Sequence, residues 1–207
     1  MKILFLGDSI TEGVGASAPE KRYVNLVAEH LNCKVLNYGV SGTRIARQKQ
    51  RSDQLLFDWD FNSRASIMEK EADFVFVFGG TNDYGHGDAD IGEKNSRDFY
   101  TFYGAINNLI LYMIDTYGKD KLCFILPLHR CDEVGIRGKA LKEFVEILRM
   151  ALKNNEVDFL DFFENGLPMP TSGETDKYFC DGLHPNDKGH KWIADRVCEY
   201  LEKRFNA

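Results

Sequence analysis

The sequence has no long apolar run and no cluster of basic residues. Its apolar runs are short, such as residues 74–78, whereas a helix that crosses a bilayer needs roughly 20 apolar residues. Lys and Arg number 26 against 32 Asp and Glu, which gives a net charge of −6. Nucleic-acid binding needs concentrated Lys and Arg to neutralise phosphates. We therefore expect neither a membrane span nor a nucleic-acid partner.

The cysteines and the N-terminus also lack recognisable patterns. There are five cysteines, an odd number, and no CxxC pair, so neither a disulfide framework nor a zinc site is indicated. The first ten residues contain one lysine and a short apolar stretch that ends at Gly7, which is too little for a secretory signal. We expect reduced thiols and a cytoplasmic protein.

The 207 residues suit one compact domain, which we expect to span residues 1–207. Hydrophobic residues make up 43% and charged residues 28%, an ordinary balance for a soluble protein. Short apolar runs, the candidate strands, lie at residues 3–6, 35–38, 74–78, 122–126 and 157–159. Such unbroken runs are typical of strands buried on both faces. They alternate with helix-length stretches, which predicts an α/β fold: a three-layer α/β/α sandwich around a mostly parallel five-stranded sheet.

Four longer helices are expected between and after these strands. Residues 17–20 have a capping-box pattern that opens a helix to about Leu31. Apolar residues recur at helical spacing over 99–117, from Ile136 to Leu152, and over 192–201. We interpret these stripes as core packing. The pattern of residues 43–72 predicts no definite secondary structure. The segment forms either a lid or wall of the site or a partly helical surface segment.

A serine follows the first predicted strand, in Gly7-Asp8-Ser9. A serine on a strand-to-helix turn is exposed at the edge of the sheet, where it can act as a nucleophile. A glycine-rich turn before a helix can equally hold a phosphate. The segment fits neither the GxGxxG nor the GxxxxGK[ST] pattern, which argues against a nucleotide site, and it is not the GxSxG turn of α/β-hydrolases.

Possible hydrogen-bond donors follow the next two strands. Gly42 offers an unobstructed backbone N–H, and Asn82 in Gly79-Gly80-Thr81-Asn82-Asp83 offers a side-chain amide that can stabilise an oxyanion. Each segment is also consistent with an ordinary turn.

Asp181 and His184 lie just before the last predicted helix, three residues apart. If the segment folds as one turn, the carboxylate accepts a hydrogen bond from Nδ1 of the histidine and leaves Nε2 free as a general base. The alternative is a surface loop. Three of the four segments fall at carboxyl ends of predicted strands, where a parallel sheet gathers its site.

Together the four segments resemble the SGNH (GDSL-type) hydrolase family, which is defined by GDS, a glycine, GxND and DxxH in that order. Here the blocks read Gly7-Asp8-Ser9, Ser41-Gly42, Gly80-Thr81-Asn82-Asp83 and Asp181-Gly182-Leu183-His184. The resemblance spans nearly the whole chain and implies the flavodoxin-like fold of that family.

The resemblance also implies roles for individual residues. Ser9 is the nucleophile, His184 the base and Asp181 its orienting carboxylate. The Ser9 N–H, the Gly42 N–H and the Asn82 side-chain amide form the oxyanion hole. In the second block Gly39 is the alternative to Gly42, which is preferred because it follows Ser41. Asp8 and Asp83 support the site, and no metal or organic cofactor is required.

Three further residues are candidate substrate contacts: His86, His129 and Arg130. For His86 the alternative is a plain loop, and for Arg130 it is an ion pair with Asp132. The expected activity is hydrolysis of small acyl esters by a Ser-His-Asp triad, with acetylated carbohydrates among the substrates. The alternatives are a lysophospholipase or thioesterase for longer acyl chains and a non-catalytic binding module. The expected partner is a small-molecule ester, and the sequence allows a homo-oligomer.

Overall fold

Five parallel strands form one central sheet in the order β2-β1-β3-β4-β5. The computed structural model describes residues 1–134, 138–171 and 173–205. The strands are Lys2–Gly7 (β1), Lys34–Gly39 (β2), Phe74–Phe78 (β3), Leu122–Ile125 (β4) and Asp158–Leu160 (β5). The predicted α/β class is confirmed, and every pairing in the sheet is parallel.

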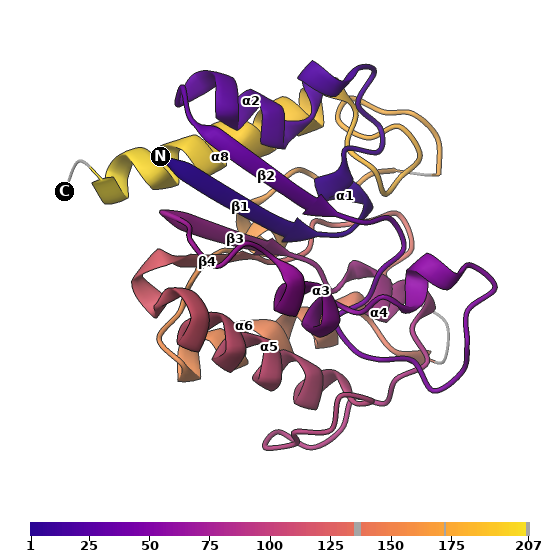
Figure 1. The fold of residues 1–207 in the computed structure, drawn as a ribbon. Coiled ribbons are helices and arrows are strands. Elements are labelled where there is room, and N and C mark those ends of the chain that lie inside the picture. The colour runs from indigo at the N-terminus through magenta and orange to yellow at the C-terminus, as the bar shows by residue number, and fades with distance from the viewer. Residues whose placement is uncertain (135–137, 172, 206–207) are drawn as a thin grey trace.

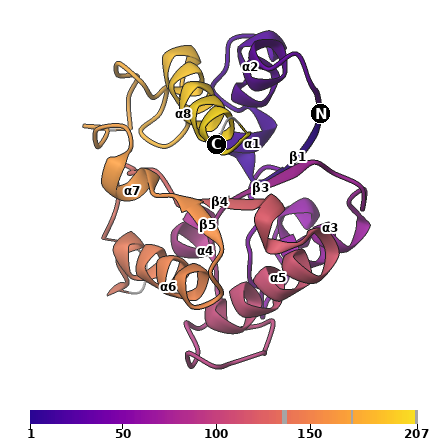
Figure 2. The same ribbon diagram turned by 90° about the vertical axis from the view of Figure 1, so that its left-hand side faces the viewer.

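Helices cover both faces of the sheet (Figures 1 and 2). One face carries α2 (Tyr23–His30) and α8 (Asp187–Phe205), and the other carries α3 (Phe61–Ile67), α5 (Phe102–Tyr117) and α6 (Leu141–Asn154). The side chains of β3 show that both faces of the sheet are apolar and are buried by helices. Phe74, Phe76 and Phe78 pack with the α2 and α8 side, whereas Val75 and Val77 pack with the α5 and α6 side. All five are buried, so the unbroken apolar run marks a strand covered on both faces.

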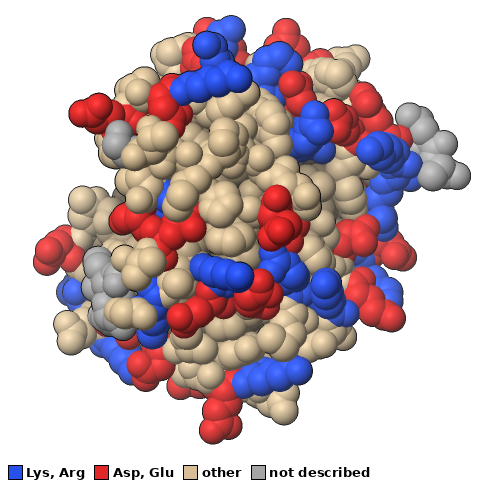
Figure 3. All heavy atoms as spheres, turned by 180° about the vertical axis from the view of Figure 1, so that it is seen from behind, with Lys and Arg blue, Asp and Glu red and all other residues tan. Residues whose placement is uncertain are grey.

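The remaining elements are short: α1 (Ser9–Glu12), η1 (Pro19–Lys21), η2 (Leu55–Asp58), α4 (Thr81–His86), η3 (Lys119–Lys121) and α7 (Phe162–Asn165). None of the described helices combines the length and apolarity that crossing a membrane requires. The five cysteines are free, and two of them, Cys123 and Cys198, are buried. Seen from behind, the described surface carries Lys and Arg side chains interspersed with Asp and Glu (Figure 3).

The capping box predicted at residues 17–20 is wrong. The Ser17 hydroxyl and N–H both donate to Asp187, at 2.6 and 2.7 Å, so this serine secures α8 rather than starting a helix of its own. α2 begins only at Tyr23. The other three helices are confirmed as α5, α6 and α8. α5 starts at Phe102, after Thr101 caps it, and Ile136 of the predicted third helix lies outside the described residues.

The order of the strands reverses between β1 and β3. β2 follows β1 in sequence but lies on its outer side, while β3 lies on its inner side and leads to β4. In open parallel sheets, ligands bind at the carboxyl ends of the strands beside such a point. Ser9 begins α1 just after β1, and Asn82 lies in α4 just after β3. The fold therefore brings both residues to the edge where a site is expected.

Candidate active site

Ser9, His184 and Asp181 are linked by hydrogen bonds. His184 Nε2 lies 2.9 Å from Ser9 Oγ, and His184 Nδ1 lies 2.6 Å from Asp181 Oδ2. A carboxylate only accepts, so Nδ1 carries the proton of the imidazole and the Nε2 lone pair faces the Ser9 hydroxyl. This arrangement can deprotonate a serine for nucleophilic attack.

One tight turn positions both Asp181 and His184. The other carboxylate oxygen of Asp181 accepts from the N–H groups of Leu183 (3.0 Å) and His184 (2.7 Å). Partial burial acts to raise the pKa of Asp181, but hydrogen bonds from the backbone and ring of His184 outweigh it and hold that pKa below its ordinary value. The turn is tied to the loop after β4, because the Cys131 N–H donates to Gly182 O at 2.9 Å. The DxxH spacing thus predicted the local geometry correctly.

The turn from β1 into α1 places Ser9. Asp8 caps α1, and its side chain accepts from the Ile10 N–H at 3.1 Å. A side chain at Gly7 would not fit, since a Cβ there would lie 2.0 Å from Thr11 Oγ1. Asp8 is buried, and burial raises its pKa to about 6. Its contact is with the backbone of the turn, which suits a supporting residue.

Asn82 is buried and is bonded to Thr43, the residue after Gly42. Asn82 Nδ2 donates one hydrogen to the carbonyl of Thr43 at 3.0 Å, which fixes the amide and leaves its second hydrogen for another acceptor. Gly42 has a φ of +72°, and a Cβ on it would lie 2.1 Å from Phe57 Cε1. Only glycine fits this position without strain.

The N–H groups of Gly42 and Ser9 are unpaired within the described part of the chain. Gly39, the alternative in the second block, differs because its N–H donates to Asn37 Oδ1 at 2.8 Å. The geometry therefore favours Gly42 over Gly39 as a free donor. Together with the second hydrogen of Asn82, these groups can receive a negatively charged oxygen.

Arg64 is a buried residue of α3 that the sequence did not single out. Its Nη1 donates to the carbonyls of Gly7 (3.0 Å) and Tyr38 (2.6 Å), and its Nη2 donates to Thr43 Oγ1 (2.7 Å). One guanidinium thus joins the ends of β1 and β2 to the residue after Gly42. Burial lowers the pKa of Arg64 to about 10.

Asp83 ties α4 to the same stretch of chain. Its two carboxylate oxygens accept from the N–H groups of Ile45 and Ala46, both at 2.9 Å. Asp83 is buried, and burial raises its pKa to about 7 although the two donors act in the opposite direction. This contact gives Asp83 a supporting position, because it fixes the chain that follows Gly42.

Asp83→Asn is expected to change how stability depends on pH. An amide can accept from only one of the two backbone N–H groups, which costs about 1–3 kcal/mol. Because the folded-state pKa is raised, folded wild-type protein binds more protons than unfolded protein between about pH 4 and pH 7, so its stability falls as pH rises through that window. The variant lacks this term. The difference in free energy of unfolding between wild type and variant should therefore shrink from pH 5 to pH 8.

Urea unfolding at several pH values measures this difference. Asp120→Asn, at an exposed carboxylate, is the matched control. A wild-type advantage that is constant or grows with pH would contradict the raised pKa of Asp83.

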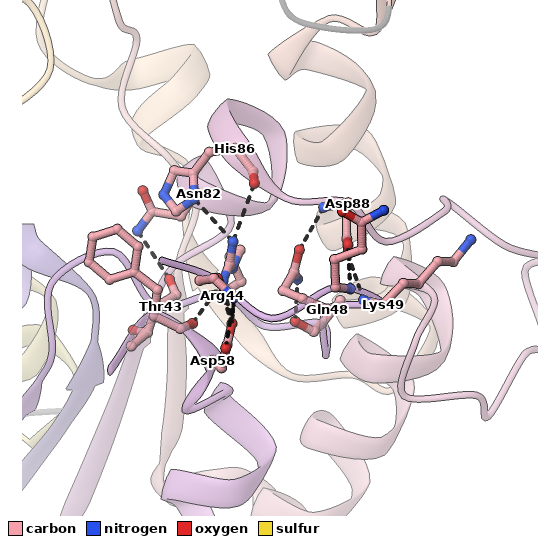
Figure 4. Close-up of polar contacts among 12 residues, drawn as sticks. Thr43, Arg44, Gln48, Lys49, Asp58, Asn82, His86 and Asp88 are labelled. Atoms are coloured by element: carbon pink, nitrogen blue, oxygen red, sulfur yellow. Dashed lines mark hydrogen bonds and ion pairs between the residues drawn. The ribbon is translucent and has the colours of Figure 1, made fainter. Parts of the chain in front are cut away.

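Part of residues 43–72 borders Gly42, which fits the first of the two predictions for this segment in that part: we call residues 52–58, which contain Phe57, the wall. The chain runs from Thr43 through an irregular stretch into η2 and then α3. Phe57 of η2 packs against Gly42, and its ring centroid lies 5.5 Å from that of His86. Arg44 lies between this wall and α4 (Figure 4). The helical pieces η2 and α3 also fit the alternative prediction of a partly helical segment.

The three candidate substrate contacts differ in their partners. Nδ1 of His129 lies 2.5 Å from Glu133 Oε1. Arg130 pairs with Asp132 at 2.6 Å, which was the alternative prediction, and donates to the Thr81 carbonyl at 3.2 Å. Arg130 thereby holds the first turn of α4. His86, at the end of that helix, stays more than a third exposed.

The described residues contain no group of three or more His, Cys, Asp or Glu side chains that could hold a metal ion. The groups at the site itself are hydrogen-bond donors, one imidazole, one hydroxyl and one carboxylate.

Comparisons with known proteins identify the family and the fold of this chain. A family model described as the GDSL-like Lipase/Acylhydrolase family matches residues 5–192. A crystal structure from Lactobacillus plantarum is 26% identical, with a TM-score of 0.81 over 98% of this chain and 96% of that chain. An acetyl xylan esterase (20% identity, TM-score 0.69, 97% and 100% of the two chains) and the M. smegmatis aryl esterase (17%, 0.68, 98% and 98%) share the fold. No curated protein matches this chain.

Proposed function

The chain belongs to the GDSL-like lipase/acylhydrolase family, and from that premise we propose that it is a serine ester hydrolase acting on small acyl esters, including acetylated carbohydrates. The observation that carries the proposal is the 2.9 Å contact between Ser9 Oγ and His184 Nε2, with Asp181 on the far side of the ring. A hydroxyl, a base and an orienting carboxylate in this order are the parts that acyl transfer needs.

The reaction proceeds through an acyl-enzyme. Ser9 Oγ attacks the ester carbonyl carbon while His184 Nε2 takes its proton. The resulting oxyanion accepts from the Ser9 N–H, the Gly42 N–H and the free hydrogen of Asn82 Nδ2. Each such donor is worth about 3 kcal/mol in comparable sites.

The intermediate then collapses. His184 passes its proton to the leaving alcohol, the C–O bond breaks, and the acyl group stays on Ser9. A water molecule next attacks the acyl carbon while His184 takes a proton from it. His184 finally returns that proton to Ser9 Oγ, and the carboxylic acid leaves.

The position of Phe57 favours a substrate with a short acyl group. Its ring lies directly against Gly42 and so closes the wall beside the proposed oxyanion hole. That two structural neighbours are named as an acetyl xylan esterase and an aryl esterase is consistent with such substrates on this fold.

A longer acyl chain is the second candidate, and a specific feature favours it. Three large apolar side chains that flank Phe57 in the chain are exposed: Leu55 (60%), Leu56 (62%) and Trp59 (40%). An acyl chain that passed over Phe57 would contact them, as a lysophospholipase or thioesterase requires. A non-catalytic module has less support, since the hydrogen bonds of the triad are all in place.

A series of p-nitrophenyl esters separates these candidates. We expect wild-type kcat/KM to fall at least about tenfold from acetate to octanoate. Phe57→Ala should raise the octanoate-to-acetate ratio about tenfold, because removal of the ring opens the wall beside Gly42. Phe205→Ala, at an exposed ring on α8, is the matched control. A wild-type preference for octanoate would overturn the small-acyl proposal in favour of the longer-chain candidate.

A further inference from the structure

We propose that Arg44 fixes His86 as a neutral hydrogen-bond donor beside the oxyanion hole, and that His86 uses its Nε2–H to bind a neutral oxygen of the substrate. The proposal rests on the function above in one respect: the substrate is an ester held at Ser9. It names Arg44 as a positioning residue and His86 as a residue that determines specificity.

The position of His86 follows from α4. Asn82 and His86 are four residues apart in this helix, so their side chains project from the same face, with His86 one turn further along (Figure 4). Phe57 links them to the second block, because its ring packs against Gly42 and lies 5.5 Å from the ring of His86. His86 therefore lies beside the same residue, Phe57, that packs against Gly42. Because the His86 side chain is exposed, a bound molecule can reach it.

Arg44 sets the tautomer of His86. Arg44 Nη1 lies 3.2 Å from His86 Nδ1 and 3.2 Å from the His86 carbonyl oxygen. A guanidinium only donates, so Nδ1 must accept, and the single proton of the neutral ring must sit on Nε2. The contact with Nδ1 directs that edge of the ring toward Arg44, and the contact with the carbonyl oxygen fixes Arg44 against the end of α4. The edge that carries Nε2–H therefore points away from Arg44.

Arg44 is itself held firmly by the wall. It is buried, and its Nη2 donates to three oxygens: Ser52 Oγ (2.6 Å), the Phe57 carbonyl (3.1 Å) and Asp58 Oδ1 (3.1 Å). The tautomer of His86 thus depends on the same segment that supplies Phe57. A change in this wall alters both the space beside Gly42 and the hydrogen bond offered by His86.

The charges around His86 keep it neutral. Besides Arg44, the cation Arg130 acts on the ring, and the carboxylates that act on Arg44 are those of Asp58, Asp83 and Asp88. Desolvation and the two arginines lower the pKa of His86 to about 4. At neutral pH the ring offers an N–H without a positive charge. This suits a hydroxyl, ether or carbonyl oxygen of a sugar ester, and it gives no advantage to an anionic substrate.

Nitrogen NMR of the histidine rings tests the first half of the proposal. In wild-type protein we expect His86 to show the neutral Nε2–H tautomer from pH 8 down to pH 5. In Arg44→Gln it should populate both tautomers and protonate at a pH at least one unit higher. Arg196→Gln, at an exposed arginine of α8, should leave the His86 signals unchanged. Protonation of wild-type His86 near pH 6.5, or a proton on Nδ1, would overturn the proposal even if the Arg44 variant fails to fold.

Kinetics on two acetyl esters test the second half. His86→Phe keeps a ring against Phe57 but removes the donor, whereas His86→Gln restores an N–H. We expect His86→Phe to raise KM for xylose tetraacetate about tenfold, with a smaller effect on p-nitrophenyl acetate, and His86→Gln to recover most of the loss. Equal losses on both substrates, or no effect on xylose tetraacetate, would overturn the role of His86. Failure of the ester hydrolase proposal gives a different result. Wild-type protein would then hydrolyse neither substrate, whereas the expected tautomer of His86 would still be seen by NMR.

Discussion

Ser9→Ala is expected to lower kcat/KM on p-nitrophenyl acetate by about 10⁴-fold or more. The substitution removes the attacking oxygen, and the donors at Gly42 and Asn82 then stabilise only the slow attack of water. Ser9 Oγ contacts His184, and Ala is well tolerated in a helix, so the fold should be retained. The thermal unfolding midpoint of the variant, compared with that of wild-type protein, tests whether the fold is retained.

Covalent labelling gives an independent measurement of the same prediction. A fluorophosphonate should modify Ser9 in wild-type protein and should not modify the Ser9→Ala variant. Peptide mass mapping identifies the modified residue. Ser66→Ala, at an exposed serine of α3, is the control for the substitution. Labelling at another residue, or a Ser9→Ala variant with more than a tenth of wild-type activity, would disprove Ser9 as the nucleophile.

Asp181→Asn should lower kcat/KM by about 10³–10⁴-fold. The amide can still accept from the N–H groups of Leu183 and His184, so the turn should survive. An amide NH₂ facing Nδ1 cannot accept a proton, however, and it favours the tautomer with hydrogen on Nε2. That tautomer cannot deprotonate Ser9. Because the Asp181 side chain is 46% exposed, water can partly replace it, and the lower end of the range is expected.

The double variant tests whether these residues act as one unit. Asp181→Asn added to Ser9→Ala should cause little further loss, since members of a triad are strongly non-additive. Asp195→Asn, at an exposed carboxylate of α8, is the matched control. If Asp181→Asn alone costs less than about tenfold, Asp181 is not the orienting carboxylate.

Local patterns in the sequence predicted the frame of the molecule well. The apolar run of β3 indicated a strand buried on both faces, and the DxxH spacing indicated the turn that holds Asp181 and His184. Both features depend on residues close together in the chain. Since three of the four family blocks follow strands, their meeting at one edge of the sheet also followed from the parallel topology.

The supporting contacts could not be predicted in this way, because their partners are far apart in sequence. Arg64 bonds to Gly7 across 57 residues, and nothing near either position marks the pair. Ser17 illustrates the opposite error. Its local pattern indicated a helix cap, but its hydroxyl donates a hydrogen bond to Asp187, which lies 170 residues away in the sequence. Arg44 lies in a polar stretch that gave no sign that its side chain would be buried.

The chain just after Gly42 is anchored separately from the segment that contains Phe57. Arg64 holds the chain at Thr43, and Asp83 holds it at Ile45 and Ala46, before the wall that contains Phe57 begins. Insertions or deletions between residue 48 and η2 can therefore reshape the wall without moving the donor. Changes in this segment would therefore alter which substrates the proposed hydrolase accepts and leave the contacts of Ser9 in place.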